Sequence, residues 1–194
     1  RYNSADSMQA AEHLHGSARL DLRQHGNRWQ GELALHLTRG EILITPYYLK
    51  IDGAPLDLSA RLDWQPGRLA LRDLTLDDGA TRAEAALDWN LAQNRLIALE
   101  LHNLRSDADH LYRRYLKPLL GDGLFGDAEL RGSLYLRGNY RDGKAGDLAA
   151  VLNHIHISDR QGRYELHDLD GQAGNNGAPS RIHIASARWH KLPV

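Results

Sequence analysis

Eleven histidines are the residues of this sequence that could most readily hold a metal ion. Two pairs, His13/His15 and His154/His156, have the i, i+2 spacing that places both rings on one face of a β-strand. Both pairs lie in the phase opposite to the apolar residues, and Ile155 continues the apolar phase between the second pair. Polar side chains in that phase face water, so we expect solvated histidines and no metal site.

Two pairs of aspartates, Asp77-Asp78 and Asp168/Asp170, have the spacing for shared acid–base chemistry. Both pairs fall at expected turns or strand ends, where aspartate is favoured for local hydrogen bonding. The sequence has no nucleophile-elbow pattern, no glycine-rich loop leading into a helix and no HExxH motif. We therefore predict that the chain is not an enzyme and uses no cofactor.

Composition narrows the possible partners. Lys and Arg number 24 against 25 Asp and Glu, which gives a net charge of -1 and no concentrated basic surface for nucleic acid. There is no cysteine, which excludes a disulfide scaffold. No apolar run is long enough to span a bilayer. Because the chain starts at Arg1 without a leader, we expect residues 1–194 to be a single β-rich segment of a longer protein.

The elements that must position these residues are strands. Apolar residues recur at every second position, which is typical of antiparallel sheet with one apolar and one hydrated face. The clearest of about ten such runs are 56–64, 83–89 and 130–138, and turn residues separate them at 65–67, 77–79, 142–144 and 175–177.

Two phase shifts interrupt this alternation. The apolar positions change from even to odd between Ile44 and Leu49, around Pro46, and from odd to even between Leu71 and Leu74. A bulge or corner at each place would keep a single apolar face.

A helix is expected within residues 106–120. Ser106 or Asp107 can cap its first turn, Leu111 and Tyr115 follow at helical spacing, and Pro118 with Gly121 ends or kinks it. We expect this helix to lie across one end of the sheet and plug it.

The apolar face is the remaining candidate for function. A second sheet would turn it into an ordinary sandwich core, whereas a single curved sheet would leave a trough suited to acyl chains. Alternation fits both structures. We expect Arg61, Glu84, Arg131 and Arg137 to point outward, and the trough to be lined by Leu58, Leu62, Trp64, Leu87, Trp89, Leu99, Leu101, Leu134 and Leu136.

The segments LRDLTLDDGATRAEAALDW (71–89), LYRRYLKPLL (111–120) and AELRGSLYLRGNYRDG (128–143) resemble the AsmA-like family of Gram-negative bacteria, of the TamB, YhdP and YdbH type. The resemblance covers about residues 71–172. It rests on the general pattern of leucine-rich alternating strands, and no invariant family residues can be assigned to positions in this sequence. It implies an all-β, mainly antiparallel fold: a curved, open-sided meander sheet that forms a groove with one short helix.

The same resemblance implies a periplasmic lipid-binding segment of a protein that is anchored in the inner membrane and carries phospholipid to the outer membrane. Its partners would be phospholipid acyl chains and neighbouring β segments of the same protein, and it would reach the membrane only through parts absent here. The sequence leaves two other functions open. One is a structural β-sandwich that mediates protein contacts through its sheet edges. The other is a sugar-binding or carbohydrate-active module, for which Tyr47-Tyr48 is the only visible stacking platform.

Overall fold

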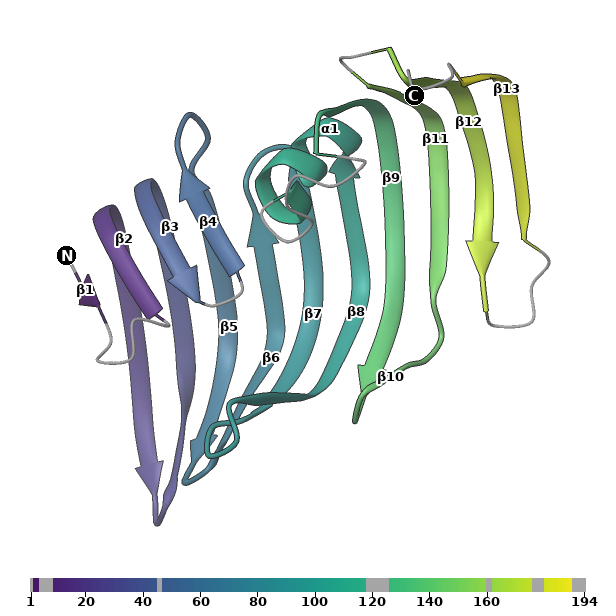
Figure 1. Cartoon of the computed structure of the whole chain (residues 1–194). Coiled ribbons are helices and arrows are strands. Elements are labelled where there is room, and N and C mark those ends of the chain that lie inside the picture. The colour runs from purple at the N-terminus through teal and green to yellow at the C-terminus, as the bar shows by residue number, and fades with distance from the viewer. Residues whose placement is uncertain are drawn as a thin grey trace.

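A single open sheet makes up most of the described structure (Figure 1). The computed structural model describes residues 2–3, 9–44, 47–117, 126–159, 162–175 and 180–189. Of these residues 78% lie in strands, and the sheet has thirteen strands and is not closed into a barrel. The predicted fold class, an antiparallel, open-sided meander with one short helix, is therefore confirmed.

The strands follow one another across the sheet in nearly the order of the sequence, as a meander requires. Ten of them have nine residues or more, which agrees with the expected number. The path across the sheet runs through β1 (Tyr2–Asn3), β2 (Gln9–His25), β3 (Arg28–Ile44), β5 (Leu56–Gln65), β6 (Arg68–Asp77), β7 (Thr81–Asn90), β8 (Arg95–Asp107), β9 (Ala128–Arg141), β11 (Ala149–Asp159), β12 (Tyr164–Gly174) and β13 (Arg181–Trp189). Two short strands lie off this path, namely β4 (Tyr47–Ile51) beside β3 and β10 (Lys144–Ala145) beside β9.

The second phase shift is a bulge in β6. Asp73 has φ of 47°, and the pairing with β5 and β7 shifts at this point. The extra residue returns Leu71 and Leu74 to the same face of the sheet. The first phase shift is instead a change of strand, because Ile42 pairs with Leu49 across β3 and β4. Pro46 lies outside the described residues.

The helix begins where the sequence predicts it. α1 (Ala108–Leu111) continues directly as the π-helix η1 (Tyr112–Leu116), and the carboxylate of Asp107 caps α1 by accepting from the backbone N–H of His110. Ser106 is the alternative cap that the structure does not use, since it still belongs to β8. Pro118 and Gly121 lie outside the described residues. Figure 1 shows the helix at one end of the sheet, near the ends of β4 and β9.

The two faces of the sheet differ as predicted. The side chains of Arg61, Glu84, Arg131 and Arg137 are all exposed. The opposite face, which we name the leucine face, carries Leu58, Leu62, Trp64, Leu87, Trp89, Leu99, Leu101, Leu134 and Leu136. No second sheet covers it among the described residues, so this part of the chain forms no sandwich.

Candidate functional site

The leucine face is continuous across the sheet because strand register aligns its apolar residues into rows. Residues opposite each other on neighbouring strands project from the same face. One row, which we name the central row, crosses nine strands from β2 to β12 through direct partners. It consists of Ala18, Leu35, Leu58, Leu76, Ala83, Leu104, Leu136, Ala150 and Ala173.

Two further rows lie nearer the turns that join β5 to β6 and β7 to β8. Leucines form the first, which runs through Leu22, Gly31, Leu62, Leu71, Leu87, Leu99 and Tyr140. Tryptophans dominate the second, which runs through Trp29, Trp64, Leu69, Trp89 and Leu96. Its first two rings lie 6.4 Å apart between centroids, within the range of favourable aromatic contact.

All nine residues predicted to line the trough share this face. Strand register also places the two leucines outside these rows on the leucine face: Leu101 pairs with Ala85, and Leu134 pairs with Leu152. Sequence reasoning omitted Trp29, Leu76 and Leu104 from the site. Their alternation with polar neighbours was the signal that could have included them.

The leucine face remains accessible. Eight of the nine trough residues are half-buried, and the ninth, Trp64, is 39% exposed. Leu20 on β2 and Ile182 on β13, at the two sides of the same face, are 55% and 54% exposed. A sandwich core would bury such residues almost completely, so the structure presents an extended apolar surface to whatever lies above it.

The helix closes one end of this surface. Leu111 and Tyr112 of the helix are buried, as is Ile51 of β4 beside it, and Leu56 at the start of β5 is 4% exposed. Under the helix, the hydroxyl groups of Thr81 and Ser106 form a buried hydrogen bond of 2.6 Å across β7 and β8.

Asp78, in the turn between β6 and β7, fixes the helix to the sheet. Its side chain is completely buried. One carboxylate oxygen accepts from His110 Nε2 at 2.8 Å and from the hydroxyl of Tyr115 at 2.6 Å, and lies 3.3 Å from Arg114 Nη1. The other oxygen accepts from the backbone N–H of Thr81 at 2.7 Å. These contacts tie three helical side chains to one turn of the sheet.

The electrostatics of this cluster favour a charged Asp78. Burial acts to raise the pKa of its carboxyl, but the hydrogen bonds from Tyr115, His110 and Thr81 outweigh burial and hold the pKa below its usual range. Burial, followed by the Asp78 hydrogen bond, raises the pKa of Tyr115, which keeps that hydroxyl protonated as a donor. Arg114 has no other ion pair among the described residues, and its Nε and Nη2 atoms are buried without a hydrogen bond there.

Acid should destabilise the protein through its paired carboxylates. A hydrogen bond from Arg28 lowers the pKa of Asp63, and a hydrogen bond from the backbone N–H of Gly79 lowers the pKa of Asp77. The pKa of Asp78 is also lowered, by the hydrogen bonds described above. Each folded pKa is below the unfolded value of about 3.9, so their stabilisation is complete above that pH and is lost as pH falls through the folded pKa. Urea midpoints should decline below about pH 4, and a midpoint that stays constant down to pH 2.5 would contradict this prediction.

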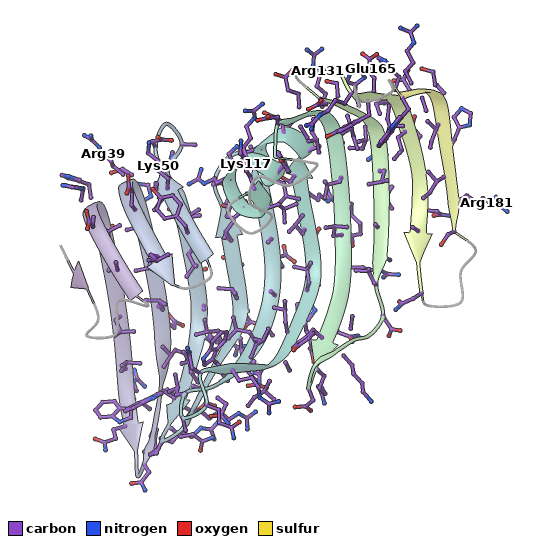
Figure 2. The ribbon with its side chains drawn as sticks, in the orientation of Figure 1. Arg39, Lys50, Lys117, Arg131, Glu165 and Arg181 are labelled. Atoms are coloured by element: carbon purple, nitrogen blue, oxygen red, sulfur yellow. The ribbon has the colours of Figure 1, made fainter. Side chains whose placement is uncertain are left out.

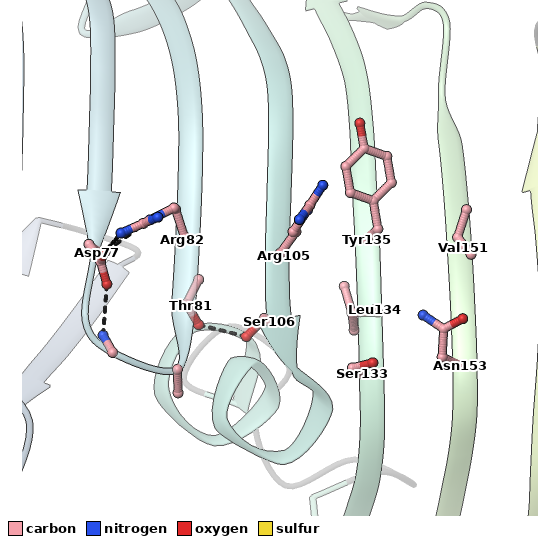
Figure 3. A pocket seen from close by; sticks show the side chains of 12 residues that line it. Asp77, Thr81, Arg82, Arg105, Ser106, Ser133, Leu134, Tyr135, Val151 and Asn153 are labelled. Carbon is pink, nitrogen blue, oxygen red and sulfur yellow. Dashed lines mark hydrogen bonds and ion pairs between the residues drawn. The ribbon is translucent and has the colours of Figure 1, made fainter.

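The face opposite the leucine face is polar. One hollow on this face, shown in Figure 3, is lined by Asp77, Arg82, Arg105, Tyr135 and Asn153, among others. Arg82 is paired with Asp77, and the guanidinium carbon of Arg105 lies 5.9 Å from the centre of the Tyr135 ring. The charges in the hollow are partly paired, which suits a hydrated outer surface.

Neither aspartate pair forms a shared acid–base site. Asp77 bonds to Arg82 and to the N–H of Gly79, whereas Asp78 points into the helix cluster. In the other pair, Asp170 accepts from the backbone N–H of His154, while Asp168 occupies a left-handed position. Asp77 keeps the local hydrogen bonding that its turn position predicts, whereas Asp78 and Asp170 accept hydrogen bonds from distant segments of the chain.

The stacking platform expected for sugar binding is only partly visible. Tyr48 is 40% exposed on β4. The side chain of Tyr47 lies outside the described part of the structure.

The fold and the site define a class of protein: a single-layer, open β-meander with a continuous apolar face, closed at one end by a helix. No protein-family model, curated protein or solved structure matches this chain significantly. Among the described residues, no helix is long and apolar enough to cross a membrane.

Proposed function

We propose that residues 1–194 bind lipid acyl chains along the leucine face, as one segment of a protein that carries phospholipid between two membranes. The observation that supports this most strongly is the continuous, uncovered apolar face. Exposed apolar surfaces of such extent are uncommon on monomeric soluble proteins and mark ligand or partner sites. Each methylene group that leaves water for such a surface contributes about 0.8 kcal/mol.

The dimensions of the face suit acyl chains. The central row crosses nine neighbouring strands. Eight steps of about 4.8 Å give a row about 38 Å long. The hydrocarbon core of a bilayer, which holds the chains of two leaflets, is about 30 Å thick. A phospholipid could therefore lay its chains along the row while its headgroup stays in water.

The resemblance to AsmA-like proteins supports the cellular part of the proposal. In such a protein the segment would lie in the periplasm, tethered to the inner membrane through parts outside residues 1–194. Neighbouring β segments would extend the groove on either side, so that lipid passes along it without crossing water.

Native mass spectrometry of the purified protein tests this function. We expect adducts with the mass of one or more phospholipids after expression in bacteria, or after incubation with phospholipid vesicles and removal of the vesicles. Matched measurements with a soluble headgroup lacking acyl chains, such as glycerophosphocholine, should give no adduct. Bare protein after both treatments would overturn the proposal.

Protein contact through a sheet edge is the second candidate. All nine residues of β13 are exposed, and its outer side pairs with no strand among the described residues. An unpaired edge can accept a strand from a partner. This function predicts concentration-dependent self-association or capture of a β segment, and no phospholipid adduct.

A further inference from the structure

Three side chains that commonly bind metal converge on the polar face of the sheet. They are His156 on β11 and Glu165 and His167 on β12, and their ligand atoms all lie within 4.8 Å of one another. The Nε2 atom of His167 is 3.2 Å from Glu165 Oε1. The rings of His156 and His167 are 4.1 Å apart between centroids.

Strand register explains why these residues meet. Ile157 pairs with Leu166, so the preceding His156 falls beside His167 on the opposite face. The next pair joins Ile155 to Leu169, which leaves Asp168 as the extra residue of a bulge with φ of 49°. Glu165 and His167, two residues apart on one strand, share this face.

We propose that His156, His167 and Glu165 form a zinc-binding site. Two imidazole nitrogens and one carboxylate oxygen are ligands that zinc accepts, with bonds of about 2.0–2.2 Å. Ligands of a tetrahedral ion with such bonds lie about 3.3 Å apart, close to the Glu165–His167 separation. Small rotations of His156 would complete the set, and water would occupy the fourth position.

The surroundings of the three side chains limit the affinity for a metal ion. Arg131 lies opposite His156, and Arg188 lies opposite Glu165. Figure 2 shows Arg131 and Glu165 at the same end of the sheet. These two cations repel a metal ion, while the site remains half-exposed to incoming zinc.

A bound ion would join β11 to β12 through side chains. It would stiffen the polar face next to the edge strand β13 while leaving the leucine face free. The zinc site therefore does not depend on lipid binding.

Isothermal titration of metal-free protein with zinc chloride tests the proposal. We expect one saturable site per chain, weakened at least tenfold by His156→Gln, by His167→Gln and by Glu165→Gln. The control is His154→Gln on the same strand. Its ring is 81% exposed and lies 3.3 Å from Asp170, outside the cluster, so affinity should stay within twofold of wild type.

Cobalt substitution gives a second measurement that needs no variant. Cobalt bound by the three side chains and water should show the intense visible absorption of tetrahedral coordination, and zinc should abolish it. Absence of saturable zinc binding, equal weakening by His154→Gln and His167→Gln, or only the weak absorption of hydrated cobalt would each overturn the proposal.

Discussion

Replacing Asp78 with alanine should lower the free energy of unfolding by about 3–5 kcal/mol, because it removes one partner of a buried ion pair. The side chain is completely buried and receives hydrogen bonds from His110, Tyr115 and Thr81. Without it, Arg114 keeps a side chain that is 9% exposed and loses its only ion pair among the described residues. Urea unfolding, followed by circular dichroism, measures the loss.

The neighbouring aspartate is the matched control. The side chain of Asp77 is 37% exposed, and its partner Arg82 is 69% exposed. Exposed pairs of this kind contribute up to about 1 kcal/mol, so Asp77→Ala should cost no more than that. Equal losses for the two variants would show that Asp78 does not anchor the helix.

Replacing Leu134 with aspartate should abolish lipid binding with only a modest loss of stability. The residue is half-buried on the leucine face, so its new carboxylate can stay hydrated while it occupies the path of an acyl chain. The lost apolar burial amounts to about 1–2 kcal/mol, part of the value for a fully buried leucine. Melting temperature and phospholipid adducts in native mass spectrometry measure the two effects on the same sample.

Two control variants are compared with Leu134→Asp, one on the polar face and one at a buried leucine. Ser133→Asp introduces the same charge one residue away on the polar face, where Ser133 is exposed, and should leave lipid binding unchanged. Leu56→Asp changes a leucine that is 4% exposed at the start of β5, and should cost several kcal/mol. If Leu134→Asp unfolds the protein as Leu56→Asp does, the leucine face is a closed core and the proposed groove is wrong.

The faces of the sheet could be predicted from the sequence because strand alternation is local. The run 56–64 already separates Leu58 and Leu62 from Arg61, and the structure keeps this division. The phase change between Leu71 and Leu74 likewise required a bulge, which the structure places at Asp73. Each of these inferences needs only neighbouring residues and the two-residue period of a strand.

Contacts between distant segments could not be predicted in the same way. Asp78 meets His110 and Tyr115 across more than thirty residues, and no local pattern indicates that contact. The meeting of His156 with His167 depends on the register of β11 and β12 and on the bulge at Asp168. The sequence showed only the spacing of His154 and His156, for which we expected solvated histidines and no metal site. The alternation of apolar and polar residues also could not show whether a second sheet covers the leucines. A sandwich and a single open sheet both require one apolar face.

Photolabelling with a phospholipid that carries a photoreactive group on one acyl chain tests the central claim most directly. After irradiation, mass spectrometry of peptides locates the labelled residues. The proposal predicts labels on the leucine face, at positions such as Leu62, Leu87 and Leu134, and their loss in Leu134→Asp but not in Ser133→Asp. Labels confined to the polar face or to the β13 edge, or no label on the wild-type protein, would contradict it.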